Sequence, residues 1–300
     1  MNPAFAAFSN VVLLSGFSGA DVAVLNGHER PFVRKAARTP AANPVLQRQS
    51  QRQGWLSQVL EGDARTPEVV GEGMVEGCFY FDMSFVAGRD AVAFLDTADF
   101  AAVQRFAGRI EGLMARLSTQ AAEPECAVTP SREAVLAKTR EIAERTGGAF
   151  AGLLDGLAEQ TARVPEAVFA RPATAVHGDL TFENILVDRG GGLWLIDSID
   201  GPFTHYWLDM AKLFQECEGH WHAHRNRPIG VSVTAYLRRR WMTAAEKLDP
   251  AYPLIHYVLL ALTFARILPY ARSPDDVHFL ERRVRSFTEG ASRALTEYAG

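Results

Sequence analysis

One stretch of the chain concentrates acidic and amide side chains among apolar residues that are typical of a core. It spans residues 175–200 and reads AVHGDLTFENILVDRGGGLWLIDSID. Asp179 and Asn184 lie five residues apart, a spacing that a compact loop can hold on one side of itself. Asp197 follows a short apolar strand pattern, and a turn at glycines 190–192 would fold this strand back onto the preceding one. The three side chains are therefore expected in one region.

Carboxylate and amide oxygens are hard ligands of the kind that hold Mg²⁺ beside phosphate oxygens. A carboxylate such as Asp179 could instead accept or steer the proton of an attacking hydroxyl. The stretch thus predicts metal ions with a nucleotide's phosphates on their far side. A lone Asp–Asn pair can also simply cap a turn, and the third residue, Asp197, is what favours the functional interpretation.

The same stretch resembles the kinase-like small-molecule phosphotransferases, the superfamily of aminoglycoside phosphotransferases and choline kinases. HGDLTFEN resembles the catalytic loop H-G-D-x-x-x-x-N, and IDSID resembles the metal segment I-D-x-x-D/E, in the same order along the chain. The resemblance implies that Asp179 is the catalytic base or orienter and that Asn184 and Asp197 bind magnesium. It implies a structural role in the loop for His177, and for Asp200 either a second metal ion or the substrate side. We interpret Glu183 of the loop as a solvated residue.

The first 87 residues contain the expected nucleotide site. Residues 11–35 predict three antiparallel strands, the first two joined by a Gly/Ser loop. The loop resembles the phosphate-covering hairpin of the superfamily, although such a loop alone is more often a plain turn. The resemblance implies phosphate contacts from Ser15, Gly16, Ser18 and Gly19.

Lys35, in the third predicted strand, matches the superfamily lysine that contacts the α and β phosphates. Arg34 competes for this role, because a shift of one residue would exchange which side chain faces the nucleotide. A helix is predicted to follow, with Asn43 as its cap and Pro44 at its first position. The superfamily places a glutamate on this helix to pair with the lysine, but here no Glu or Asp occurs until Glu61.

Gln49 is the best-placed substitute for that glutamate, with Gln53 next. An amide oxygen can orient an ammonium group without neutralising its charge. The missing acidic residue keeps open a second class of function, a catalytically inactive nucleotide-binding regulatory protein. Glutamines on a solvated helix face are the plain structural alternative.

The segment FYFDMSFVAG resembles the strand and hinge that hold the adenine in the superfamily. The resemblance implies that Met83 flanks the ring and that the backbone of Ser84 and Val86 pairs with its edge. An ordinary core strand would have nearly the same sequence.

Beyond Gly88 the apolar periodicity becomes helical. The expected fold class is α+β, a two-lobed protein-kinase-like fold. Residues 1–87 form a small antiparallel-sheet lobe with one helix that binds nucleotide, and residues 88–300 form a larger, mainly helical lobe for catalysis and acceptor binding, with the active site between them. Asp209, at the start of an apolar helix, matches the superfamily residue that holds the backbone of the catalytic loop, and its charge also suits a helix N-terminus.

Three alternating histidines raise the question of a metal site, but no acidic or cysteine partner stands at site spacing. They are His220, His222 and His224, and we expect them to border the acceptor pocket or lie on the surface. Trp207 and Trp221 are candidates to stack on a sugar face or a quaternary amine.

Composition narrows the classes of function. The net charge of −4 gives no global basic field, so no nucleic-acid partner is expected. The longest apolar run, Tyr257–Ala265, is about half as long as a bilayer span, so no membrane partner is expected either. Three separated cysteines suggest neither a disulfide framework nor zinc and favour a reducing cytoplasm.

The expected function is transfer of the γ-phosphoryl group of ATP, with Mg²⁺, to the hydroxyl of a small molecule, a sugar or an amino alcohol. Besides the regulatory alternative, a protein kinase ranks last. The sequence lacks an A-P-E segment, and the next helix begins soon after Asp197, which leaves no activation loop of the usual length.

Overall fold

The structure is a computed structural model that describes residues 2–14, 20–26, 30–60, 62 and 64–299. The chain forms two compact units, each assembled from two parts of the sequence. The first contains Met1–Arg89 and Asn184–Ile199, and the second contains Asp90–Glu183 and Asp200–Gly300. Each unit is described by itself below.

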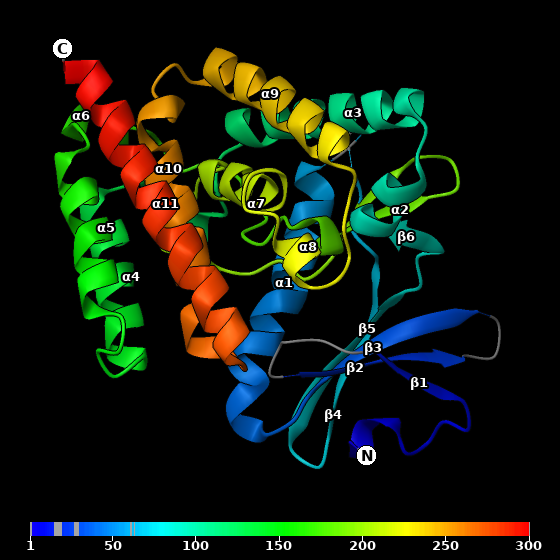
Figure 1. Cartoon of the computed structure of the whole chain (residues 1–300). Helices are drawn as coiled ribbons and strands as arrows, with labels where there is room; N and C mark the ends of the chain where they lie inside the picture. The colour runs from blue at the N-terminus through cyan, green and yellow to red at the C-terminus, as the bar shows by residue number, and fades with distance from the viewer. Residues whose placement is uncertain (1, 15–19, 27–29, 61, 63, 300) are drawn as a thin grey trace. The chain divides into compact units, whose positions relative to one another are not determined.

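A five-stranded antiparallel sheet is the main element of the first unit (Figure 1). Its strand order is β1-β2-β3-β5-β4. The strands are β1 (Val11–Leu14), β2 (Ala20–Asn26), β3 (Pro31–Ala37), β4 (Val69–Val75) and β5 (Cys78–Ser84). β1, β2 and β3 pair in the order of the sequence and β4 pairs with β5, whereas β3 pairs with β5 and not with β4. The three antiparallel strands expected over residues 11–35 are confirmed.

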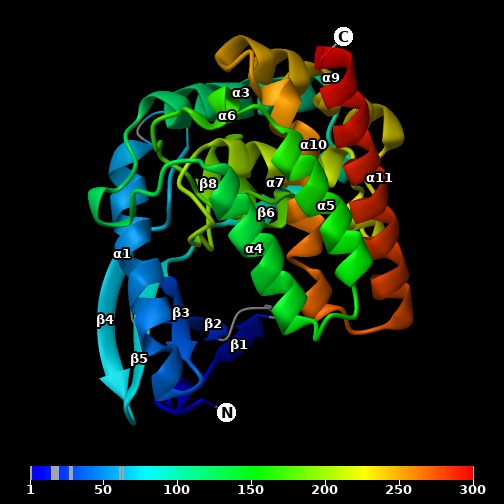
Figure 2. The ribbon, with the colours of Figure 1, turned by 90° about the vertical axis from the view of Figure 1, so that its left-hand side faces the viewer.

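Among the described residues of this unit one α-helix is present, α1 (Asn43–Val59), and it packs against β3, β4 and β5 (Figure 2). Asn43 was expected to cap the helix, and this is wrong: the cap position is Ala42, which has no side-chain capping bond. The Asn43 amide instead donates to the carbonyl of Gly77 and accepts from the N–H of Phe79, each at 2.8 Å. The Asn43 side chain thus makes its hydrogen bonds to the turn between β4 and β5 and not to the end of the helix.

The centre of the sheet is covered on both faces, because successive side chains of a strand point to opposite faces and apolar residues lie on each, whereas β1 and β4 have exposed side chains. On one face, Phe81 and Met83 of β5 pack with Leu46 of α1. The other face packs against the N-terminal turn η1 (Pro3–Phe5), where Phe5 is fully buried. Burial of one such large side chain stabilises the fold by roughly 1.5–3 kcal/mol, so the alternation fixes the strand register.

A hairpin of β7 (Ile185–Asp188) and β8 (Leu193–Leu195) completes the first unit. It lies in a three-stranded sheet of order β6-β7-β8, in which β6 spans Gly88–Asp90. The Asp188 carboxylate closes the turn by accepting from the N–H groups of Gly190 and Gly192, each at 2.8 Å. The strand pair and the glycine turn expected from the sequence are confirmed.

The second unit is helical, and the side chains of Asp90, Asp99 and Ser131 each cap the start of a helix. Helices α4, α5, α10 and α11 lie side by side (Figure 2). The helices are α2 (Ala91–Thr97), α3 (Phe100–Thr119), α4 (Arg132–Arg145), α5 (Ala151–Arg163), α6 (Glu166–Phe169), α7 (Trp207–Cys217), α8 (Trp221–His224), α9 (Val231–Leu248), α10 (Tyr252–Ala265) and α11 (Pro274–Ala299). The expected fold class, a small antiparallel sheet with one helix followed by a mainly helical region, is confirmed.

By length and composition alone, the stretch Tyr252–Tyr270 around α10 could cross a membrane. Its best window has a mean hydropathy of 1.4, and 67% of that window is buried in the fold. Packing of α10 against α7 and α11 accounts for its apolar composition. The division of nucleotide and acceptor binding between residues 1–87 and 88–300 stays a prediction.

Candidate active site

The catalytic-loop sequence of the second unit is held by a buried carboxylate. Asp209 Oδ2 accepts from the His177 N–H at 2.6 Å, and Asp209 Oδ1 accepts from the Gly178 N–H at 2.7 Å. Asp209 is completely buried and lies in the first turn of α7, so both roles expected for it are present. Gly178 has φ = 89°, a left-handed conformation that side chains disfavour. The backbone leading into Asp179 is therefore fixed.

Lys212 Nζ lies 2.9 Å from Asp179 Oδ1, an ion pair that the sequence analysis did not find. The lysine side chain is 9% exposed and the aspartate side chain 27% exposed. A signal was present in the sequence, because Lys212 follows Asp209 by three residues on one helix and therefore shares its face. The pattern D-x-x-K in an apolar helix could have indicated that both side chains reach the loop.

The surroundings of Asp179 favour its charged form. Burial alone would raise the pKa of this carboxyl, but the ion pair with Lys212, together with smaller electrostatic contributions from Arg266 and His177, lowers it further than burial raises it. The net result is a pKa below the ordinary value of 3.8. Asp179 is thus ionised at neutral pH, as a proton acceptor must be.

In the first unit, Lys35 meets Asp197: Nζ of the lysine lies 2.8 Å from Oδ1 of the aspartate. Lys35 shares a face of the sheet with Phe81, its partner in the β3–β5 ladder. Arg34, on the other face, makes two hydrogen bonds to the Asp82 carboxylate at 2.7 and 2.8 Å. The sequence left open whether Lys35 or Arg34 takes this position, and in the structure it is Lys35 that contacts Asp197. Its contact with phosphates stays a prediction.

Asp197 and Asn184 come from adjacent backbone segments, since the Asn184 carbonyl accepts from the Ile196 N–H at 3.1 Å. Asp197 has φ = 61°, a left-handed conformation that costs a non-glycine residue about 1–2 kcal/mol. Such strain is commonly found at ligand sites. Asp200 belongs to the second unit and is exposed.

The oxygen-bearing side chains of Asn184 and Asp197 suit Mg²⁺ better than a metal ion that is held by protein ligands alone. Among the residues that the structure describes, no three His, Cys, Asp or Glu side chains gather to hold a metal ion. Magnesium usually keeps waters and binds one or two protein oxygens together with substrate phosphates. Asn184 and Asp197 would be such a pair, and the Asp197 side chain is 44% exposed.

The glutamines of α1 differ in burial. Gln49 is partly buried, and its expected contact with Lys35 stays a prediction. Gln53 is buried and donates to the Pro67 carbonyl at 2.6 Å and to the Met83 sulfur at 3.8 Å. Gln53 therefore supports the expected hinge, and the counter-charge of Lys35 is Asp197.

At the expected hinge, Met83 is buried in the core of the first unit. The Ser84 N–H donates to the Glu68 carbonyl at 2.8 Å, and the Val86 carbonyl accepts from the Gly88 N–H at 3.0 Å. A purine edge would have to use other backbone groups of Ser84 and Val86 or displace these bonds. The loop residues Ser15, Gly16, Ser18 and Gly19 lie outside the described residues.

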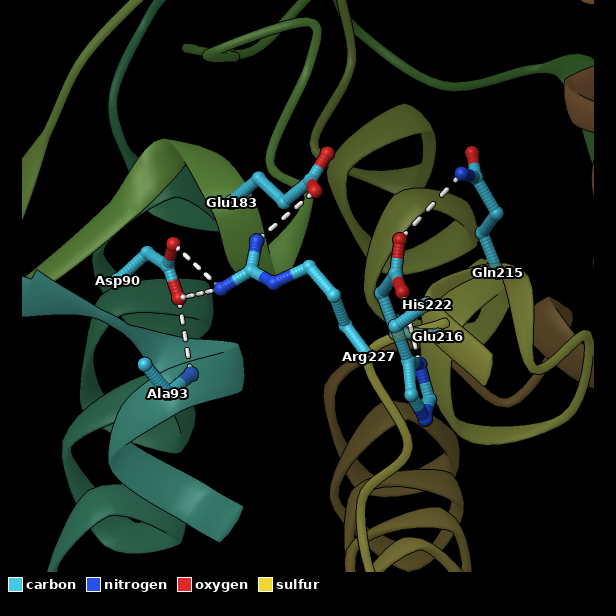
Figure 3. A network of polar contacts seen from close by, with 7 residues as sticks. All are labelled: Asp90, Ala93, Glu183, Gln215, Glu216, His222 and Arg227. Atoms are coloured by element: carbon cyan, nitrogen blue, oxygen red, sulfur yellow. Dashed lines mark hydrogen bonds and ion pairs between the residues drawn. The ribbon is translucent and has the colours of Figure 1, made fainter. Parts of the chain in front are cut away.

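Glu183 is partly solvated, with its side chain 38% exposed, but it also has an ion-pair partner that the sequence analysis did not find. Figure 3 shows Arg227 between two carboxylates, with Nη1 3.0 Å from Glu183 Oε1 and Nη2 2.7 Å from both oxygens of Asp90. Asp90 also caps α2 by accepting from the Ala93 N–H at 2.8 Å. Arg227 thereby joins the catalytic loop to the start of α2.

The histidines do have acidic partners, contrary to expectation. His222 Nδ1 lies 3.0 Å from Glu216 Oε2 (Figure 3), and His224 Nε2 lies 2.8 Å from Asp276 Oδ1. His222 is buried, so it does not lie on the surface. Trp207 is also fully buried, so the proposed stacking of this ring on a ligand is wrong.

The sequence matches the model of the phosphotransferase enzyme family, APH, over residues 11–253. The chain belongs to this family. Comparison with curated protein sequences gives no significant match. Solved structures of family members share the fold at low identity. The GDP and kanamycin complex of APH(2″)-IIIa is 16% identical with a TM-score of 0.66, and the match covers 95% of this chain and 94% of that one.

Two further solved structures also share the fold of this chain at low sequence identity. ADP-bound APH(2″)-Ib is 14% identical with a TM-score of 0.61, covering 97% of this chain and 95% of that one. The streptomycin–ATP ternary complex of APH(2″)-IIa is 13% identical with a TM-score of 0.59, covering 95% and 94%. At such identity the likeness concerns the fold, and the family assignment makes the protein a phosphotransferase.

Proposed function

We propose that the protein transfers the γ-phosphoryl group of ATP, with Mg²⁺, to a hydroxyl group of a small molecule, a sugar or an amino alcohol. The observation that carries the proposal is the Asp179 site. This carboxylate stands on a loop fixed by Asp209, is paired with Lys212 at 2.9 Å and has a lowered pKa. It is thus ready to accept or steer the hydroxyl proton.

The remaining roles follow from charge and donor type. Lys35 supplies a buried positive charge for nucleotide phosphates, the role of a point-charge lysine. Asn184 and Asp197 would hold magnesium, with Asp200 as a further candidate. When bound, the metal neutralises charge on the phosphates. Asp179 as base or orienter contributes on the order of 10²–10⁴-fold to the rate.

Two observations support a small molecule as the acceptor. Kanamycin and streptomycin appear in complexes of structurally similar proteins, and both carry hydroxyl groups on sugar-like rings. The segment after Asp197 reaches α7 at Trp207 without a long loop for an extended peptide. We therefore keep the protein kinase alternative last.

A regulatory protein without chemistry remains the second candidate, motivated by the missing glutamate on α1. The ion pair between Lys35 and Asp197 disfavours it, because the lysine retains an acidic partner in the metal segment. A degenerate protein would have no need to retain Asp179, Asn184 and Asp197 in its sequence.

The test is nucleotide turnover by purified protein with ATP or GTP, with and without Mg²⁺. The acceptor panel comprises simple sugars, amino alcohols, kanamycin and streptomycin. We expect Mg²⁺-dependent transfer to at least one acceptor, and near-complete loss in Asp179→Asn with unchanged nucleotide affinity. Asp155→Asn, an exposed aspartate on α5, is the matched control. Normal turnover in Asp179→Asn would refute the assignment, and nucleotide binding without a metal requirement or turnover would favour the regulatory candidate.

A further inference from the structure

A line of polar side chains runs from Asp179 into the interior of the second unit. Its first member is Lys212, which donates to Asp179 Oδ1 at 2.9 Å and to Gln215 Oε1 at 3.2 Å. Gln215 Nε2 in turn donates to Glu216 Oε1 at 3.3 Å. These three residues of α7 are between 1% and 7% exposed.

The line ends at His222, whose Nδ1 lies 3.0 Å from Glu216 Oε2 (Figure 3). The side chains of His222 and Glu216 are each 1% exposed. Removing such groups from water costs several kcal/mol unless each finds a partner, and apolar residues of similar volume would pack there at no such cost. A contribution to the stability of the fold therefore does not explain these buried polar side chains. A role in orienting the side chain at the other end of the line explains them better.

The hydrogen bonds give the line a direction. The Glu216 carboxylate is an acceptor, so the Gln215 amide must present its nitrogen to Glu216 (Figure 3). Its oxygen is then the atom that accepts from Lys212. An ammonium group only donates, so Lys212 faces two acceptors, the Gln215 oxygen and the Asp179 carboxylate. Each member thus fixes the orientation of the next, and the last one oriented is Asp179.

We propose that Lys212 is a positioning residue for phosphoryl transfer: it holds the Asp179 carboxylate in one orientation and in its charged form, while Gln215, Glu216 and His222 hold Lys212. The inference rests on the proposed function, in which Asp179 acts on the acceptor hydroxyl. It adds to that function a set of residues from α7 and α8 that lies outside the catalytic-loop and metal-segment motifs.

The first test measures the charge of Asp179 directly and needs no acceptor. The ¹³C carboxyl resonance of Asp179, assigned with Asp179→Asn, is titrated in the wild-type protein and in Lys212→Met. The groups that face this carboxylate are Lys212 from α7, Arg266 at the end of α10 and His177 of the loop. In Lys212→Met, only Arg266 and His177 oppose the effect of burial, which raises the pKa of Asp179. The Asp179 resonance should therefore titrate at higher pH than in the wild type.

The control for this titration is Lys247→Met, which removes an exposed lysine of α9. It should leave the Asp179 titration where it is in the wild type. An unchanged titration in Lys212→Met would overturn the proposal, whether or not the protein transfers phosphoryl groups.

The second test is kinetic and uses the first acceptor that the panel identifies. Lys212→Met should lower kcat about 10- to 100-fold, by analogy with the loss of activity when a residue that orients a metal ligand is removed. The acid limb of the kcat/KM profile should move to higher pH, and the KM for nucleotide should stay constant. Wild-type turnover together with an unshifted profile in Lys212→Met would overturn the positioning role and leave the proposed function intact.

Folding of the variants is checked by circular dichroism, and Gln215→Leu provides a second perturbation that keeps the lysine. It removes one anchor of Lys212, so kcat should fall less than in Lys212→Met and the acid limb should move in the same direction. Lys212→Arg keeps the charge and should restore much of the wild-type profile. Loss of kcat in Lys212→Arg and Lys212→Met alike, without movement of the acid limb in either, would mark a merely structural role.

Discussion

Lys35 and Asp197 are 162 positions apart in the sequence, yet Nζ of the lysine lies 2.8 Å from Oδ1 of the aspartate. The lysine side chain is 2% exposed, whereas the aspartate side chain is 44% exposed. A buried ammonium requires a partner, because an unpaired charge in the interior is costly. One oxygen of the Asp197 carboxylate is thus paired with the lysine, and part of the carboxylate stays open to solvent.

Replacement of Lys35 by methionine should weaken nucleotide binding. A hydrogen bond to a charged group contributes about 1.5–3 kcal/mol, so we expect the Kd for MgATP to rise about 10- to 100-fold. Isothermal titration calorimetry measures this directly. Arg38→Met is the control, since it removes a cation of the same strand region whose side chain is 54% exposed and pairs with Asp21. An unchanged Kd in Lys35→Met would show that this lysine does not contact the nucleotide.

The sequence predicted the elements better than it predicted the partners of individual side chains. Alternating apolar residues and glycine turns were enough for the sheet of the first unit and for the β7–β8 hairpin. The choice between Lys35 and Arg34 was open because it depends on a register of one residue, and the pairing of Lys35 with Phe81 decides which face it takes. Local pattern cannot supply that information, since it lies in another strand.

The partners of Asp179 and Glu183 could not be read from the motif that contains them. Lys212 and Arg227 follow the catalytic loop by about thirty to forty-five residues, and their contacts depend on how α7 and the segment before α9 pack. Asn43 shows the same limit at short range: it had the right residue type for a helix cap, but the turn between β4 and β5 supplied competing partners. Tertiary contacts decide among uses that the local sequence permits equally.

Asp209 holds the catalytic loop with both oxygens, so Asp209→Asn should loosen it. Asparagine can accept with one oxygen, and its NH₂ group would then face a backbone N–H donor. We expect the free energy of unfolding to fall by about 1–3 kcal/mol, the cost of a buried donor without an acceptor. Urea denaturation measures the loss, and hydrogen exchange should show faster exchange at His177 and Gly178. Exchange rates equal to those of the wild type would contradict the assigned anchoring role.

His205 should make the protein sensitive to acid. Burial, with a smaller contribution from Arg171, lowers the pKa of this imidazole to about 3, while Asp249 acts in the opposite direction. Its Nδ1 also accepts from the Trp207 N–H at 3.4 Å, which requires a neutral nitrogen. Between pH 6.5 and about pH 3 the unfolded chain binds a proton that the folded chain does not, so stability falls as the pH falls through this window.

The expected slope from this group is about 1.4 kcal/mol per pH unit below pH 6.5. Urea unfolding at several pH values between about 7.5 and 4.5 covers the window. His205→Phe removes the titrating group and should flatten the dependence by that amount, whereas His278→Phe, at an exposed position of α11, should leave it as in the wild type. Equal slopes in His205→Phe and the wild type would show that another group causes the acid sensitivity.

Arg227 should be needed for its geometry and not for its charge alone. Its guanidinium reaches Glu183 of the catalytic loop and Asp90 at the start of α2 at once, a fork that a lysine ammonium cannot reproduce. The side chains are about one-quarter to two-fifths exposed, so solvent screening limits the energy, and we expect Arg227→Met to lose about 1–2 kcal/mol of stability. Arg227→Lys should recover little of this loss, because it can bond one carboxylate well and leaves the other without its partner. Thermal denaturation of both variants separates an effect of geometry from an effect of charge, and Arg239→Met, at an exposed position of α9, is the control. Full recovery of stability in Arg227→Lys would mean that the positive charge suffices and that the contact with two carboxylates does not hold the loop.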